Sequence, residues 1–371
     1  MITITPTLEI PPEIAEGLAN EIYYRVGGVI REVAGTKPIV AWLREVPNTS
    51  GSNLLTIANI GSSASILNLG ISVMGFALVL HKLKDLEERL QKIQKTLEKV
   101  DRKIDLGFYA NFRAALDLAT NAFSMNQSEN RKNMAVQAIN RFLEAEHIYL
   151  DYTDKELEQR SKLVHEYLLT LSLAYIAEAR CHLELEESDM AVQRLEAGFR
   201  VISDRLRKYL DILLTSNPAA YLHPKFKNEI GLGRLTKVYQ WIDPSLDAAA
   251  VFEMQRDNIF SLKKDQGSDS GYKWVNKLPQ AIVAESEVQW DIWGNREQMK
   301  KEAMSRLPKV FANMESMIET IQRFEAYQSE VKAISKLGIS FREWTLLAPV
   351  DKQQSENRTL MYLVPSRPVE A

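Results

Sequence analysis

Between Leu83 and Ile104, hydrophobic residues recur at alternating spacings of three and four positions. The residues that form this stripe are Leu83, Leu86, Leu90, Ile93, Leu97, Val100 and Ile104. Such spacing is typical of the a and d positions of a coiled coil, where one face of a helix packs against another helix. Charged residues of both signs fill the other positions. The pattern therefore predicts a coiled coil, formed either between copies of the chain or with a distant helix of the same chain.

The stretch directly before it, Leu54–Leu80, contains no charged residue over 27 positions. A helix of that length extends about 40 Å, which exceeds the ~30 Å hydrocarbon core of a bilayer. The first half is weakly hydrophobic, and the second half, from Ile66, is strongly apolar. Lys82 and Lys84 follow the segment closely, so a spanning helix would keep its C-terminal side in the cytoplasm.

As a helix, this charge-free segment carries a continuous seam of small or weakly polar side chains. The seam consists of Ala58, Gly61, Ser65, Asn68, Ser72 and Gly75. The residues expected to face lipid or a protein core include Leu67, Ile71, Met74, Phe76 and Leu78. Small residues let helices approach closely within a bilayer, but they also occur where helices cross inside a large soluble bundle. Both interpretations stay open at this point, and the length of the segment favours membrane insertion, constitutive or conditional.

Further helices are predicted along the middle of the chain, at about 134–151, 154–185 and 188–215. The sequence Met134-Ala135-Val136-Gln137 recurs as Met190-Ala191-Val192-Gln193, each time at the start of a helix after a polar break. This repetition indicates two stacked helical hairpins. The stretch 173–183, followed after the break by Ala191 and Leu195, resembles a tetratricopeptide-type helical hairpin. The resemblance implies close helix stacking and, for that family, binding of protein partners.

The two ends of the chain carry different patterns. Pro11 and Pro12 precede a short predicted helix with Ile14, Leu18 and Ile22 on one side. Two runs rich in β-forming residues, 23–33 and 38–46, predict a β-hairpin with a four-residue turn. Near the C-terminus, a long amphipathic helix is expected at 295–337, and 360–364 is expected to form a late strand that pairs with the N-terminal hairpin.

Together these patterns predict a mainly α protein. Its expected architecture is an elongated helical bundle, with a long apolar helix running into a coiled coil, stacked helical hairpins and a small N-terminal β-hairpin. Four units are expected: 1–53 with the helix and hairpin, 54–106 with the apolar helix and coiled coil, 107–262 with the helical hairpins, and 263–371 with a loop, the long amphipathic helix and the C-terminal strand.

Composition narrows the functional classes. The 371 residues are 45% hydrophobic and 26% charged, which is ordinary for a folded protein. The net charge is −3, so nothing overall attracts the chain to nucleic acid or to an acidic membrane surface. A single cysteine, Cys181, excludes an internal disulfide framework and suits a reducing compartment such as the cytoplasm.

Catalytic and ligand-binding motifs are absent from the sequence. Gly231-Leu232-Gly233 lacks the rest of a phosphate-binding loop, and His165-Glu166 is not followed by a second histidine at metalloprotease spacing. His147, His165 and His182 lie on separate predicted turns, so we expect surface or interfacial roles rather than metal binding. Cys181 is expected to be buried, and Glu184, Glu186 and Glu187 to form a solvated helix end. We therefore expect no catalytic residue, cofactor or metal.

Three functions compete on this basis. The order of apolar segment, coiled coil and helical body is similar to that of α-helical pore-forming toxins, which implies a non-enzymatic, membrane-active protein that self-associates and meets lipid conditionally. The alternative is a soluble helical scaffold or adaptor that binds protein partners through the hairpins around 152–214. An enzyme with a site dispersed over distant segments is the third, and no motif favours it.

Overall fold

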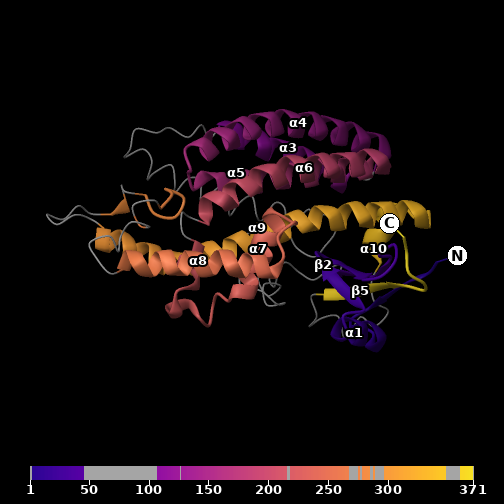
Figure 1. Ribbon diagram of the computed structural model, residues 1–371. Coiled ribbons are helices and arrows are strands. Elements are labelled where there is room, and N and C mark those ends of the chain that lie inside the picture. The colour runs from indigo at the N-terminus through magenta and orange to yellow at the C-terminus, as the bar shows by residue number, and fades with distance from the viewer. Residues whose placement is uncertain are drawn as a thin grey trace.

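The structure, a computed structural model, describes residues 2–45, 107–125, 127–214, 218–266, 275, 278–284, 287–288, 296–347 and 360–370. Within these residues the protein is mainly helical, with a small antiparallel β-sheet built largely from its N-terminus (Figure 1). The predicted charge-free segment and coiled coil lie outside the described residues.

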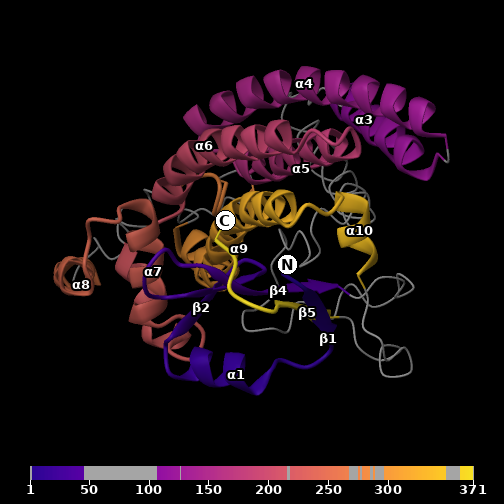
Figure 2. The same ribbon diagram turned by 90° about the vertical axis from the view of Figure 1, so that its right-hand side faces the viewer.

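Four consecutive helices pack side by side in an up-and-down arrangement. They are α3 (Gly107–Ser124), α4 (Ser128–Glu158), α5 (Leu163–Glu184) and α6 (Ser188–Leu213). Figure 2 shows α9 (Arg296–Leu337) between this helical layer and the sheet. Smaller helices complete the fold: α1 (Pro12–Ala19), η3 (Pro218–Leu222), η4 (Pro224–Phe226), α7 (Leu232–Ile242), α8 (Ala248–Gln266) and α10 (Phe341–Leu346).

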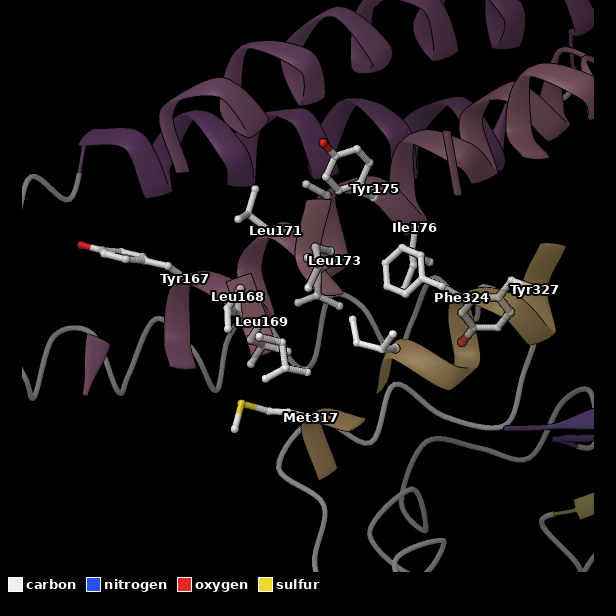
Figure 3. Packing of buried hydrophobic residues seen from close by; sticks show 14 of the residues in the cluster. Tyr167, Leu168, Leu169, Leu171, Leu173, Tyr175, Ile176, Met317, Phe324 and Tyr327 are labelled. Carbon is white, nitrogen blue, oxygen red and sulfur yellow. The ribbon is translucent and has the colours of Figure 1, made fainter. Parts of the chain in front are cut away.

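Helix α5 forms the centre of the helical layer, because 19 of its 22 residues are buried. It contacts α3, α4, α6 and α10. In Figure 3, apolar side chains of α5 such as Leu168 and Ile176 are drawn in one cluster with Met317 and Phe324 of α9. Gly198 of α6 lets the helices come close: a Cβ there would lie 2.7 Å from Tyr175 and 2.9 Å from Phe324. This confirms the predicted helical hairpin of α5 and α6.

The ends of two helices differ from the expectation. A break was expected at 152–153, but α4 continues to Glu158. Thr153 is buried, and its hydroxyl donates a hydrogen bond to the carbonyl of Tyr149 at 2.6 Å, so this polar side chain is satisfied inside the helix. The chain turns instead at Arg160, which has a φ of +52°. Helix α8 likewise extends through residues 263–266, where a loop was expected.

The sheet has five antiparallel strands in the order β1-β5-β4-β3-β2. The strands are β1 (Ile4–Thr7), β2 (Tyr23–Val26), β3 (Val29–Glu32), β4 (Ile39–Glu45) and β5 (Leu360–Pro365). The late strand is confirmed, since β5 lies between β1 and β4. The first predicted run is two strands rather than one, because Gly27-Gly28 forms a tight turn with Gly27 at a φ of +58°. Glycine adopts this backbone conformation without steric cost.

The two faces of the sheet pack on different helices. Trp42 and Leu363 belong to the large core shared with α9 and the helical layer. Ile30 and Ala41, which pair across β3 and β4, belong to a separate small cluster with Ile14 of α1. Alternation along the strands thus gives both faces apolar contacts. The prediction for Ile22 was wrong, because this side chain is 57% exposed beyond the end of α1.

Candidate functional site

The residues predicted to act on membranes or to self-associate are not among those the structure describes. They are Ala58, Gly61, Ser65, Leu67, Asn68, Ile71, Ser72, Met74, Gly75, Phe76, Leu78, Leu83, Leu86, Leu90, Ile93, Leu97, Val100 and Ile104. The structure does describe the elements on either side of them. Strand β4 ends at Glu45 and helix α3 begins at Gly107. Trp42 of β4 and Phe112 of α3 lie in the same hydrophobic core, so segment 46–106 joins two elements of one packed body.

A buried ionic cluster joins three helices of the helical layer. Arg194 of α6 donates to Glu178 of α5 at 2.6 Å from its Nε and to Glu146 of α4 from a terminal nitrogen. The guanidinium also lies over the ring of Tyr175, 5.1 Å from its centroid. Both carboxylates are at least 95% buried in the protein. This cluster of Glu146, Glu178 and Arg194 is called the helix-layer cluster below.

Two carboxyl groups share one arginine in the helix-layer cluster, and their pKa values diverge as a result. Burial and the nearby negative charge of Glu178 raise the pKa of Glu146 well above its usual range. Burial also opposes ionisation of Glu178, but its bonds with His182 and Arg194 hold its pKa below the usual value. At neutral pH the pair therefore shares one proton, and one negative charge faces Arg194.

A second buried ionic group connects the sheet to α9 and α10. Arg44 of β4 donates to the carbonyls of Trp344 and Leu347, each at 2.6 Å. The indole Nε1 of Trp344 donates to the carboxyl of Glu330 at 2.5 Å. Trp42 packs edge-on against Trp344, with ring centroids 5.2 Å apart. This group of Arg44, Glu330 and Trp344 is called the sheet clasp below.

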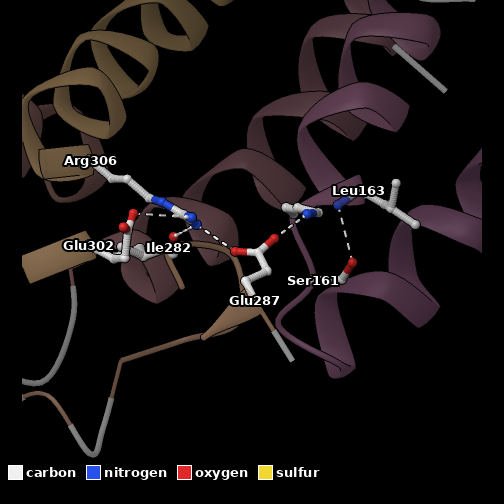
Figure 4. A network of polar contacts seen from close by, with 7 residues as sticks. Ser161, Leu163, Ile282, Glu287, Glu302 and Arg306 are labelled. Carbon is white, nitrogen blue, oxygen red and sulfur yellow. Dashed lines mark hydrogen bonds and ion pairs between the residues drawn. The ribbon is translucent and has the colours of Figure 1, made fainter. Parts of the chain in front are cut away.

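A small polar pocket of about 120 Å³ lies where the first turn of α5 approaches α6 and α9. Its lining includes Lys162, His165, Glu166, Tyr209 and Asn313. At its edge, the carboxylate of Glu287 accepts from Lys162 at 2.6 Å and from Arg306 at 2.6 Å, as Figure 4 shows. These two contacts hold the pKa of Glu287 below its usual value despite partial burial. The pocket could hold a molecule of only a few heavy atoms.

The residues considered for metal or thiol chemistry are dispersed. His147 is exposed on α4, His165 is buried at the start of α5, and His182 contacts the helix-layer cluster. Among the described residues, no group of three His, Cys, Asp or Glu is placed to hold a metal ion. Cys181 is fully buried, as predicted, and burial raises the pKa of its thiol.

The predicted solvated helix end is only partly correct. Glu186 and Glu187 are exposed. Glu184, however, is largely buried and pairs with Arg180 at 2.5 Å and with Arg131 at 3.8 Å. Arg131 comes from the start of α4, a contact that the order of residues along the chain does not reveal. The prediction failed for Glu184 because α4 covers it.

Neither the helix-layer cluster nor the sheet clasp was predicted from the sequence. One signal was present: Glu178 lies within the largely apolar stretch 173–183 and is buried in the helical layer. A charge at such a position requires a buried partner. The partner could not be named, because Arg194 and Glu146 lie on two other helices.

No helix in the described part of the chain combines the length and the apolar character needed to cross a membrane. Comparison with known proteins gave no relative either: no protein-family model, no curated protein and no solved structure matches this chain.

Proposed function

We propose that this protein is a non-enzymatic, membrane-active effector that disrupts or perforates a bilayer through its charge-free segment, Leu54–Leu80. The observation that carries the proposal is the run of 27 positions without a charged residue. Charges are strongly disfavoured at the centre of a bilayer, so their absence over a spanning length is the pattern that lipid requires. The coiled coil predicted at 83–104 would hold copies of the chain together. The protein would be made in the cytoplasm and would insert into lipid only conditionally.

The described core supports this proposal over the interpretation of a buried soluble helix. That interpretation needs a place at the centre of a bundle for the charge-free segment. In the helical layer, α5 already occupies the centre and contacts α3, α4, α6 and α10. The central apolar helix of the helical layer is therefore α5, and the charge-free segment is not needed in that position.

The connections of segment 46–106 also support the proposal. Its two flanking elements, β4 and α3, are held by a core that includes Trp42 and Phe112. A body with its own core can keep its fold while a segment between two of its elements changes partner from protein to lipid. Within this body the helix-layer cluster joins α4, α5 and α6, and the sheet clasp joins β4, α9 and α10.

Release of a fluorescent dye from anionic liposomes tests the proposal. We expect the wild-type protein to release dye and the double variant Ile71→Asp/Phe76→Asp to lose release, because each mid-bilayer charge costs about 2.5–3.5 kcal/mol on insertion scales. Phe252→Asp is the matched control, since this phenylalanine is 50% exposed on α8, and it should keep wild-type release. Equal thermal unfolding of all three proteins would show that the fold is kept.

Two results would contradict the proposal: a wild-type protein that releases no dye, or a double variant that releases as much as wild type. The scaffold alternative would then remain. It draws on the hairpins of α4, α5 and α6, whose close contacts include the buried Ala135 and Ala191 of the repeated four-residue sequence. Loss of a co-purifying protein on changing the exposed Arg141 and Glu144 of α4 would support it.

A further inference from the structure

The sheet clasp contains a buried arginine that forms hydrogen bonds to backbone carbonyls. Arg44 is 3% exposed. Its two terminal nitrogens donate to Trp344 and Leu347 at the C-terminal end of α10, at 2.6 Å each. These bonds give the carbonyls at the end of α10 a side-chain donor, and the carbonyl of Trp344 also accepts from the amide of Leu347 at 3.3 Å. Arg44 therefore holds the end of α10 against β4.

Glu330 of α9 lies beside this arginine without forming an ion pair with it. The carboxyl is 4% exposed and accepts one hydrogen bond, from the indole of Trp344. Arg44 is the cation whose charge acts on Glu330. The charge of an ionised Glu330 is thus compensated only by the neutral indole donor of Trp344 and by Arg44, whose hydrogen bonds go to backbone carbonyls. These contacts do not replace the hydration that the carboxylate loses on burial.

Charged groups on α9, β3 and α10 have partners other than Glu330. On α9 itself, Lys332 pairs with Glu196 of α6 at 3.3 Å. From β3, Arg31 donates to the hydroxyl of Ser329 and to the carbonyl of Lys37. On α10, Glu343 is exposed and forms the capping box with Ser340. The protonation state of Glu330 therefore bears mainly on Arg44 and Trp344.

We propose that the sheet clasp is a pH-sensitive contact: it is closed while Glu330 carries its proton, and it loosens when the proton passes to solvent. The ionised carboxylate attracts Arg44 away from the carbonyls of Trp344 and Leu347, so that the end of α10 separates from β4. The clasp does not depend on the proposed membrane activity. It lies at the last residues of β4, directly before segment 46–106.

The direction of the pH effect follows from the environment of Glu330. Burial raises its pKa to about 7, and the bond from Trp344 and the charge of Arg44 only partly oppose this rise. A group whose pKa is higher in the closed than in the open state favours the closed state at low pH, and this contribution is lost as pH rises through the closed-state value. The clasp is therefore closed at pH 6 and weakened at pH 8.

Hydrogen exchange on the full chain tests the clasp. With exchange rates corrected for the intrinsic effect of pH, we expect amides of 341–347 to lose protection between pH 6 and pH 8, by up to about tenfold. Glu330→Gln, a neutral isostere, should keep the pH 6 protection at both pH values. Glu319→Gln on the same helix is the control and should behave as wild type, since Glu319 is partly exposed and lies 3.5 Å from Arg323.

Equal corrected protection of 341–347 at pH 6 and pH 8 in the wild type would overturn the proposal. So would an undiminished pH response in Glu330→Gln. Should this variant not fold, a carbon-detected NMR titration of wild-type Glu330 decides: a midpoint near 7 supports the clasp, and a midpoint in the range of an exposed glutamate contradicts it.

Discussion

Helix α5 and the charge-free segment are both apolar over most of their length, yet they differ in their content of charged residues. Helix α5 carries the charged residues Glu166, Glu178, Arg180 and Glu184 within its 22 positions. The segment 54–80 carries none within 27. The comparison is informative because the surroundings of α5 are known: it is the most enclosed helix of the described bundle.

The charges of α5 are tolerated because neighbouring helices supply partners. Glu178 has Arg194 at 2.6 Å. Arg180 pairs with Glu184 of the same helix at 2.5 Å, and its guanidinium stacks on the ring of Phe341 of α10, 4.2 Å from the centroid. Arg131 of α4 lies 3.8 Å from Glu184. A protein interior can offer such partners, whereas hydrocarbon cannot. We infer that burial at the centre of this protein does not require a helix to lack charged residues. Insertion into hydrocarbon would require it, and we propose this as the explanation for the charge-free segment.

The largest expected effect comes from removing the arginine that α5 depends on. Arg194→Met should lower the free energy of unfolding by about 3–5 kcal/mol, because Glu178 is then left buried and uncompensated. Urea unfolding at pH 7 measures it. Arg141→Met is the matched control: its ion pair with Glu144 is more than half exposed, so it should cost less than about 1 kcal/mol. Equal costs for both variants would show that α5 does not rely on its partner.

A smaller effect is expected from the close approach of helices around α5. A Cβ at position 198 would lie 2.7 Å from Tyr175 and 2.9 Å from Phe324, so Gly198→Ala should cost about 1–3 kcal/mol through overpacking. Nothing lies within 4 Å of a Cβ built at Gly233 in α7. Gly233→Ala should therefore be neutral or slightly stabilising. Thermal unfolding distinguishes the two, and a neutral Gly198→Ala would contradict the packing described here.

The last prediction concerns Glu146→Gln. Because the raised pKa of Glu146 keeps its proton in the folded protein while the unfolded chain ionises, the neutral isostere should match wild type in acid and become the more stable protein as pH rises. A raised pKa stabilises the fold at low pH, and this contribution declines as pH rises towards the folded value. The variant should therefore become more stable than wild type in alkaline buffer. Parallel stability curves from pH 6 to pH 10 would contradict the assignment.

Local patterns predicted the elements whose signals are continuous in sequence. The helix expected at 295–337 is α9, Arg296–Leu337. The strand expected at 360–364 is β5, between β1 and β4. The helix was indicated by apolar residues at helical spacing, such as Met314, Ile318 and Ile321, and the strand by a short apolar run in a polar tail. The sequence predicts one strand where β2 and β3 lie, because β-forming residues occur on both sides of Gly27-Gly28. Two glycines between β-forming residues are, however, a hairpin signal in their own right.

Contacts between residues far apart in the chain could not be predicted from the sequence. The sheet clasp joins Arg44 to Glu330 and Trp344, nearly the whole chain away. The helix-layer cluster joins residues of three helices, and only Glu178 gave a sign of its burial. Ion pairs of this kind depend on which helix faces meet, which a period within one helix does not specify. The predicted membrane and coiled-coil residues stay predictions, since the structure does not describe them.

Hydrogen exchange of peptides from 54–80, with and without anionic vesicles, shows whether the charge-free segment meets lipid. Peptides of α5 provide the internal reference, because they should be strongly protected in both conditions. We expect vesicles to slow exchange in 54–80 and to leave α5 unchanged. A segment protected as strongly as α5 without lipid, and unaffected by vesicles, would contradict this expectation.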